Sequence, residues 1–522
     1  PSARLVLLLI LQMLTPARAG LSPWPFHCQN PDPLWSPDWY ERQPQENPRQ
    51  IIDEAFTLMP SFDSVPEDLV DRCHAIFDRI DLRPLRRYTH WNPDRQTRGS
   101  TGPDIQALHS KAAMHEGAHR QFKMPGSNNT RPTLISRDLS EQEHLQTAAQ
   151  LQHPFETDCL LERDLEFAIE LCTRLGPQVK EVRARVELIT AQIARATEHI
   201  DIWYMQRRPR SSPAALRPLF TAVTVILLEW PARGLPRRLA EGFEIAKYIE
   251  PSHVFRELRT DKVNREPTQL LGNTAIPFVD ELEADLRIHP TAEAILAATD
   301  EEIALGLASG YLTRSDLDKE FGPGLRRPLG RHMIFQRDKA RPIGDGKRTG
   351  HNEACCLQET IVNPSAEIAA LITRSPLESV GPSTPGADLS DQTPCLRPED
   401  MWKGFRQLQA SEHDQRFCIV TFVHAESRER VYTKLHGLPF GVGSVVNQFN
   451  RLPMLITAWL RRIYGIMTTH YFDDSACIEW RGLCATTESH GFARMSCSAS
   501  SCPSKYDDQC SRWQASWADC SM

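Results

Sequence analysis

The sequence lacks several features that define common classes of protein. Six of the 14 cysteines lie in the last 46 residues, yet no two of these six form a C-x2-C pair, so the spacing typical of structural zinc sites is absent there. The net charge of -7 excludes a uniformly basic surface that would coat nucleic acid, although a total hides local patches. The apolar stretch from Pro218 to Trp230 is too short to span a bilayer and predicts a buried helix. We expect no membrane partner.

The composition is that of an ordinary soluble globular protein, with 40% hydrophobic and 24% charged residues. A chain of 522 residues is long enough for about two to four domains. Glycine is scarcer than proline, at 26 against 39 residues, which favours long extended connections between the elements.

The two ends of the chain differ from the rest. Residues 1–20 contain an apolar run and a cleavage-like Ala17-Arg18-Ala19, the pattern of a signal peptide, but the chain begins with Pro1 rather than Met. We therefore expect a cytoplasmic or nuclear protein, with secretion only if this segment is a genuine signal peptide. Residues 481–522 form a Cys/Ser-rich tail that looks unrelated to the rest of the fold and resembles sequence read out of frame.

Between these ends the chain divides into three regions. Residues 21–150 are rich in proline and polar side chains, and we expect them to be poorly ordered apart from short helical patches. Residues 151–250 carry apolar side chains at helical spacing and predict a helical region. Within it, QRRPRSSPAALRP has four arginines and no acid, which indicates either a solvated loop or a contact with nucleic acid.

Residues 251–480 mix helical and strand patterns. A helix is predicted at 291–310, and RHMIFQ with ARPIGD predicts a hairpin at 331–345. Two further strands are expected at 417–423 and 431–435, followed by a helix from Gly443. The stretch MTTHYFDDSACIEW then predicts a strand, a tight turn and a second strand. The fold class is therefore α+β.

Two adjacent carboxylates, Asp473 and Asp474, stand in the turn of that last hairpin. Alone, such a pair is usually a solvated turn. The helix before it, however, returns the chain to the same sheet and can bring Asp400 beside the pair. Three carboxylates at one point repel strongly unless divalent cations neutralise them, and Mg²⁺ takes oxygen ligands of this kind. The order of the elements therefore predicts a site for two Mg²⁺ or Mn²⁺ ions at these three residues.

Four motifs in this order resemble reverse transcriptases, the RNA-directed DNA polymerases of retroelements: KARPIGDG, DMWKGFRQL, LPFGVGSVVNQFNR and YFDD. LPFG and FNR are more similar to retrotransposon branches, including the tyrosine-recombinase type, than to retroviral enzymes. The resemblance covers about residues 300–476 and the helical region more loosely. It implies the fingers and palm of a polymerase right hand at 251–480, with an antiparallel palm sheet.

The resemblance implies a nucleotide pocket between the fingers and the palm. Phe405 matches the steric gate that excludes a ribose 2′-hydroxyl, and Phe440 with Gly441 matches the loop that lines the pocket. Arg341 matches the fingers arginine that holds the incoming triphosphate, a task suited to a planar bidentate donor, and Lys339 would share it. If these residues had only a structural role, the two phenylalanines would be core aromatics and Arg341 would be a surface charge.

The resemblance also implies metal and primer contacts. Asp400 and Asp473 match the family's metal ligands, while Asp474 matches the auxiliary carboxylate. Tyr471 and Phe472 match residues that contact the primer end. The implied partners are an RNA or DNA template with its primer and deoxynucleoside triphosphates. Neither the template preference nor the oligomeric state is indicated by the sequence.

The sequence departs from the family pattern in three places. Pro394 and Pro398 stand before Asp400 where an apolar strand is usual, and Gly344 replaces a bulkier or acidic residue. No primer grip or thumb is recognisable in residues 481–522. We therefore expect little or no DNA synthesis from this chain as it stands, and robust primer extension with Mg²⁺ would contradict that expectation.

Two other readings stay open. The first is a non-catalytic retroelement relic that binds nucleic acid, which differs from the enzyme only in turnover. The second is a zinc metalloprotease, because His115-Glu116-x-x-His119 has the spacing of two imidazoles on one helix face with a glutamate base. Against the protease, Gly117 weakens such a helix and no third ligand stands out. A secreted chain would also carry a glycosylation sequon at Asn128.

Overall fold

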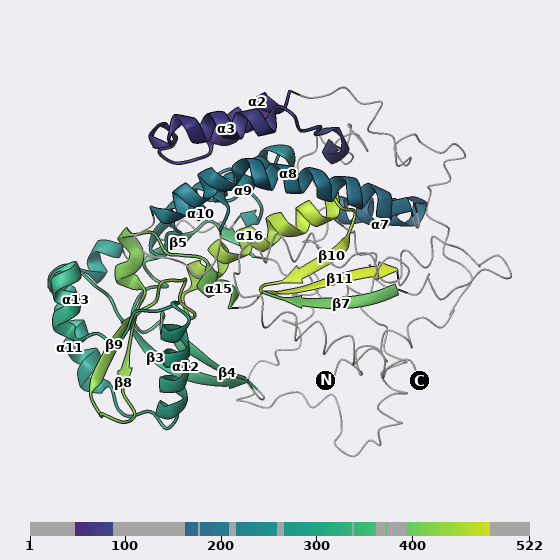
Figure 1. The fold of residues 1–522 in the computed structure, drawn as a ribbon. Coiled ribbons are helices and arrows are strands. Elements are labelled where there is room, and N and C mark those ends of the chain that lie inside the picture. The colour runs from purple at the N-terminus through teal and green to yellow at the C-terminus, as the bar shows by residue number, and fades with distance from the viewer. Residues whose placement is uncertain are drawn as a thin grey trace, which may run out of the picture.

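The computed structural model describes residues 47–86, 162–175, 178–207, 216–257, 266–336, 339–361, 372, 394–401 and 403–480, with the backbone alone for 86, 163, 173, 174, 336, 339, 394–400 and 480. These residues form a mixed α+β protein with small sheets (Figure 1). A layer of helices from the first half of the chain covers the long helix α16 (Gly443–Arg462), and a second lobe carries the larger sheet. The signal-like segment, the sequon, the His115–His119 motif and the tail lie outside the described residues.

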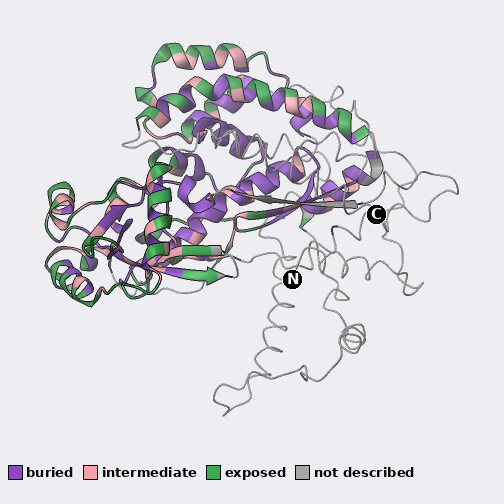
Figure 2. Ribbon diagram, turned by 60° about the horizontal axis from the view of Figure 1, so that its bottom comes forward, coloured by how far each residue is buried: buried purple, intermediate pink, exposed green. Residues whose placement is uncertain are grey.

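Within the described residues the helical layer contains six helices, and four of them lie in the region where helical spacing predicts them. They are α2 (Pro48–Thr57), α3 (Glu67–Phe77), α7 (Arg163–Leu175), α8 (Val179–Gln206), α9 (Pro218–Leu227) and α10 (Leu235–Glu241). All ten residues of α9 are buried, which confirms the predicted buried helix. Figure 2 shows the buried residues of this layer gathered on its inner side and the exposed ones on its outer side. No helix among the described residues is long and apolar enough to cross a membrane.

Residues 47–86 form two short helices, α2 and α3, within the region where short helical patches are expected. Asn47 caps α2 by accepting a hydrogen bond from the Arg49 amide at 3.1 Å, and Pro48 occupies the first turn, where its missing N–H costs nothing. Ile52 and Phe77 are fully buried in the core shared with α8 and α9. The two short helices, separately marginal, are stabilised by docking onto helices more than 100 residues later.

The second lobe is built on a four-stranded sheet in the order β4-β3-β8-β9. Its strands are β3 (Leu329–Gln336), β4 (Lys339–Gly344), β8 (Ile419–Val423) and β9 (Arg430–Lys434), and its helices are α11 (Ala275–Asp285), α12 (Ala292–Ala304) and α13 (Arg314–Phe321). The predicted 331–345 hairpin is confirmed as β3 paired antiparallel with β4. The next two predicted strands, β8 and β9, add to the same sheet through a parallel contact between β3 and β8.

The second sheet, of three antiparallel strands, lies under α16 (Figure 1). Its order is β10-β11-β7, with β10 (Met467–Tyr471), β11 (Asp474–Trp480) and β7 (Pro394–Asp400). The strand, turn and strand predicted from MTTHYFDDSACIEW are therefore confirmed. Pro394 and Pro398 do not prevent a strand before Asp400, because β7 is at the edge of the sheet, where a missing N–H need not break a ladder.

Short elements join the two lobes. Strands β1 (Lys247–Ile249) and β5 (Cys355–Leu357) pair in parallel, and β2 (Arg256–Glu257) pairs antiparallel with β6 (Glu359–Thr360). The one-turn helix α15 (Gly404–Gln407) follows β7 and packs on α16.

A buried ion pair ties the helical layer to the three-stranded sheet. Arg183 of α8 donates to both carboxylate oxygens of Glu479 in β11, at 2.6 and 2.9 Å, and also to the carbonyl oxygens of Tyr464 and Gly465 at 2.9 and 3.0 Å. The side chains of Arg183 and Glu479 are only 6% and 9% exposed. This contact fixes the end of β11 that lies away from the Asp473–Asp474 turn.

Removal of one partner of this pair should leave a buried, uncompensated charge. We expect Arg183→Met to lower the free energy of unfolding by roughly 3–5 kcal/mol, and the double variant Arg183→Met/Glu479→Met to recover part of that loss. Urea unfolding at neutral pH measures both values. Equal losses in the single and double variants would show that the pair is not what holds these elements together.

Candidate functional site

The register of the three-stranded sheet brings the predicted carboxylate positions together. Asp400 is the direct cross-strand partner of Asp474, at the ends of β7 and β11. The amide of Met401 donates to the carbonyl oxygen of Asp473 at 2.8 Å, so the chain just after Asp400 is bonded to the turn itself. Directly paired residues of an antiparallel sheet have Cα atoms about 4.5–5.5 Å apart. Asp400 therefore meets the adjacent pair Asp473 and Asp474, which follows it by more than 70 residues of sequence, at one end of this sheet.

The turn that carries the pair is a two-residue hairpin. Tyr471 pairs with Asp474, which leaves Phe472 and Asp473 at its tip. Phe472 has a φ of +56°, a conformation that non-glycine residues rarely adopt. Asp473 is half-buried and Asp474 exposed. Tyr471 is 53% exposed, and its ring lies edge-on to that of Phe472 with centroids 4.9 Å apart.

The donor set of this turn fits magnesium, because Mg²⁺ prefers carboxylate oxygens and usually takes one or two from the protein. Among the side chains that the structure describes, no group of three or more His, Cys, Asp or Glu could hold a metal ion. The side chain of Asp400 is not among them, so the fit rests on backbone placement and on the chemistry of the three residues.

Phe405 and Phe440 lie in contact with each other. Their ring centroids are 4.6 Å apart, and Phe405 also stacks on Phe449 of α16 at 4.3 Å. Phe405 is only 5% exposed, whereas Phe440 is partly buried. Phe405, the predicted steric gate, is thus the central member of an aromatic trio with Phe440 and Phe449. It is as buried as a core aromatic residue.

Gly344 and Gly441 join the hairpin of β3 and β4 to the LPFG loop. The Gly344 amide donates to the Phe440 carbonyl at 2.9 Å. A Cβ added to Gly441, which has a φ of +97°, would lie 1.8 Å from the Gly344 oxygen. A Cβ at Gly344 would meet Leu329 at 3.0 Å. This close approach of two backbones is the physical reason for Gly344 where a larger residue was expected.

We expect Gly441→Ala to lower the free energy of unfolding by at least ~2 kcal/mol, because both its φ and the neighbouring carbonyl oppose a side chain. Gly310→Ala is the control, since an added Cβ there meets nothing within 4 Å. Chemical unfolding of both variants measures the difference. A Gly441→Ala protein as stable as Gly310→Ala would contradict the close approach.

Arg341 and Lys339 lie on β4, at the free end of the hairpin. Arg341 is exposed and is the cross-strand partner of Ile334, and it has no ion-pair partner within the described part of the chain. Of Lys339 only the backbone is described. Only two residues lie between Arg341 and Gly344, so the same strand that carries the arginine is bonded at its other end to the LPFG loop.

No protein-family model and no curated protein matches the chain.

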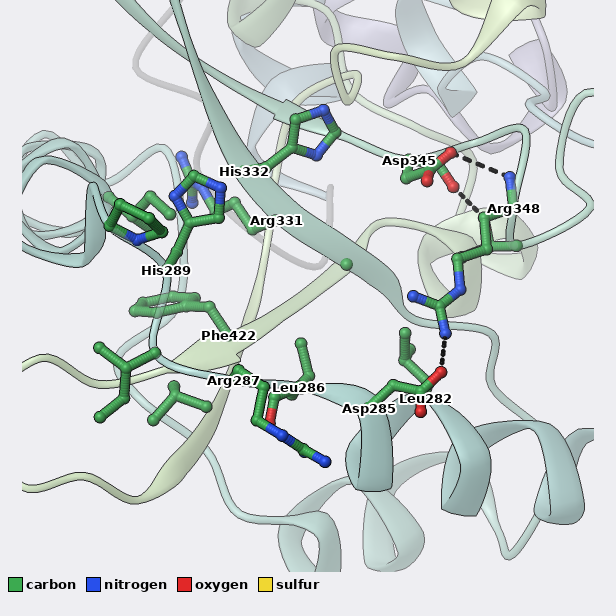
Figure 3. Close-up of a pocket in the computed structure, with 16 residues that line it drawn as sticks. Leu282, Asp285, Leu286, Arg287, His289, Arg331, His332, Asp345, Arg348 and Phe422 are labelled. Atoms are coloured by element: carbon green, nitrogen blue, oxygen red, sulfur yellow. Dashed lines mark hydrogen bonds and ion pairs between the residues drawn. The ribbon is translucent and has the colours of Figure 1, made fainter.

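A cavity of about 320 Å³ opens beside β3 in the second lobe (Figure 3). His289, His332 and Phe422 line it, and Arg348 at its rim is paired with Asp285. None of the predicted site residues whose side chains the structure describes lines this cavity. It is thus separate from the carboxylate turn and from the aromatic trio.

Sequence reasoning missed a buried charge cluster beside the trio. Glu302 of α12 accepts from Arg406 Nε at 2.8 Å and from Arg331 Nη2 at 2.6 Å, and each of the three residues is no more than 5% exposed. Burial alone would raise the pKa of Glu302, but the Arg406 and Arg331 guanidinium groups lower it to about 2. One signal was available: Glu302 lies on the buried face of α12 with Ile295 and Thr299.

The lowered pKa predicts acid sensitivity. A carboxyl group whose pKa falls from 4.5 to about 2 on folding contributes stability above its ordinary pKa and loses it as the pH falls toward 2. We expect Glu302→Gln to cost roughly 3 kcal/mol at pH 7 and clearly less at pH 3. Unfolding free energies at the two pH values test this.

Glu301→Gln is the matched control, because the neighbouring Glu301 is 52% exposed and pairs with Lys403 at 3.1 Å. Its loss should stay below about 1 kcal/mol. A pH-independent loss in Glu302→Gln would show that the buried charges do not stabilise the fold in the way described.

Proposed function

We propose that this chain is a reverse transcriptase-like nucleotidyltransferase of retroelement descent, with weak activity. The observation that carries the proposal is the pairing of Asp400 with Asp474 beside the Asp473 turn. A structural role for three acidic residues at one sheet end is unfavourable, because like charges placed together destabilise a cross-strand pair. A cation-binding role accounts for the same arrangement.

Each site residue would have a separate role. Asp400 and Asp473 would hold the metal, with Asp474 as the auxiliary carboxylate. Two Mg²⁺ ions, when bound, would supply Lewis-acid stabilisation of the attacking and leaving oxygens. Tyr471, exposed at the end of β10, would contact the primer end. Arg341, exposed and without an acidic partner among the described residues, would hold the triphosphate.

The reaction is an in-line displacement. The primer 3′-hydroxyl oxygen forms a bond to the α-phosphorus of a deoxynucleoside triphosphate, and the bond from that phosphorus to the bridging oxygen breaks. Pyrophosphate leaves, and the hydroxyl proton passes to solvent or base. The protein contributes mainly position and charge, which is why the meeting of Asp400 with the turn matters more than any single residue type.

Weak activity is expected from the pocket itself. Phe405 stacks between two aromatic rings and is almost fully buried, so little of its ring is available to the sugar of a nucleotide. The exposed Tyr471 and the half-buried Asp473, by contrast, are accessible to a primer and its metal.

Single-nucleotide addition to a labelled primer tests the proposal. With an RNA or DNA template and Mg²⁺, we expect slow addition that falls at least about 100-fold in Asp473→Asn. Asp71→Asn, at an exposed aspartate of α3, is the control and should keep the wild-type rate.

Two outcomes would contradict parts of the proposal. Addition that persists in Asp473→Asn would exclude this turn as the metal site. If the wild-type chain neither adds nucleotides nor binds a deoxynucleoside triphosphate, the polymerase assignment is wrong.

A further inference from the structure

Part of the lining of the cavity beside β3 is apolar. Leu282, Ile295 and Phe422 contribute to it, and none of the three is more than 3% exposed. The volume of about 320 Å³ is within the range of small-molecule sites, about 300–1,000 Å³. An apolar cavity of about 150 Å³ already holds benzene. The space is therefore sufficient for an organic molecule that carries one ring and a polar group.

Another part of the lining offers hydrogen-bond donors. His289 and His332 lie on one side of the cavity in the view of Figure 3, and Asp285 and Asp345 lie on the other. The Thr291 amide donates to His289 Nδ1 at 3.2 Å, so the neutral ring carries its proton on Nε2 and donates from there. His332 is half-buried and presents a second imidazole.

A buried positive charge lies in the same wall. Arg331 lines the cavity with a side chain that is only 1% exposed, and it shares its partner, Glu302, with Arg406. One carboxylate thus faces two guanidinium groups, and Arg331 Nη1 has no hydrogen-bond partner in the described part of the chain. Burial lowers the pKa of Arg331, and the Arg406 charge acts in the same direction, although Glu302 opposes both. The cluster is therefore short of one negative charge.

The charges around the cavity agree with this deficit. The charged residues of the lining, together with the two that complete the Arg331 cluster, are four arginines and three carboxylates, a net charge of +1 with neutral histidines: Arg287, Arg331, Arg348, Arg406, Asp285, Glu302 and Asp345. One negative charge neutralises this set. A doubly charged phosphate would exceed it and be repelled by the two aspartates, and a divalent cation would be opposed by the net positive charge.

We propose that this cavity binds a small organic monocarboxylate. The carboxylate accepts hydrogen bonds from His289 and His332 and is attracted by the Arg331 charge behind them. The apolar body of the ligand packs on Phe422 and Ile295. Because the cavity is separate from the carboxylate turn, its occupant is not a substrate of the proposed nucleotidyl transfer, and its binding is measured without turnover.

Calorimetric titration of the full chain with phenylacetate tests the proposal. At low salt, phenylacetate should bind about tenfold more tightly than its neutral analogue phenylacetamide, because a hydrogen bond to a charged acceptor is the stronger one. Inorganic phosphate and acetate should both bind more weakly than phenylacetate, since the first has the wrong charge and the second lacks the apolar body.

Two pairs of variants locate the site. His332→Ala should weaken phenylacetate binding about tenfold, whereas His413→Ala, at an exposed histidine that does not line the cavity, should leave it unchanged. Asp285→Asn raises the net charge of the cavity and should tighten binding about threefold. Asp280→Asn is its control, because Asp280 is equally exposed on the same helix and pairs with Arg314 outside the lining.

Several results would overturn the inference. Absence of phenylacetate binding excludes the site, and equal affinity for phenylacetate and phenylacetamide excludes recognition of a carboxylate. Tighter binding of phosphate than of phenylacetate would show that the ligand class is wrong. Unchanged affinity in His332→Ala places the ligand elsewhere, and equal affinity in the two asparagine variants contradicts the charge argument. None of these results bears on nucleotide addition at Asp473.

Discussion

The pairing of β11 with β7 is the constraint on which the candidate site depends. In a sheet the side chains alternate between the faces, so a slip of one residue would separate Asp400 from Asp474 and move it to the other face. Two contacts oppose such a slip. The Met401 amide bonds to the turn at one end of β11, and Glu479, near the other end, is bound by Arg183. The register is therefore fixed from both ends.

Buried arginines also fix distant segments relative to one another elsewhere in the molecule. Arg183 joins α8 to β11, Arg406 joins α15 to α12, and Arg461 of α16 is bound to Asp164 of α7 at 3.1 Å. Each pair links segments that are about 100 to 300 residues apart in the sequence. Apolar packing supplies most of the free energy of folding, but it is tolerant of sliding. Directional charge pairs at these three places define which arrangement is adopted.

The sequence was most informative where a pattern is local. The hairpin at 331–345, the α16 segment and the YFDD turn each follow from alternation or helical spacing over a few residues, and their order was enough to predict that Asp400 meets the turn. The residues that escaped prediction depend on distant partners. Glu302 is one of two adjacent glutamates; helical spacing with Ile295 and Thr299 indicates that it is the buried one, but only the fold shows the two arginines that pair with it. Gly344 departs from the family pattern, and only the fold shows that the backbone of Gly441 lies against it.

The two prolines of β7 have a consequence for the whole molecule. An edge strand offers its unpaired N–H and carbonyl groups to any other chain, and such edges are common starting points of aggregation. Proline has no N–H to offer, and among the described residues β7 is the outer strand of its sheet, with proline at Pro394 and Pro398. Intermolecular strand addition along this edge is therefore disfavoured. Pro394 and Pro398, which make β7 unusual as a strand, therefore also oppose self-association of the protein through this sheet edge.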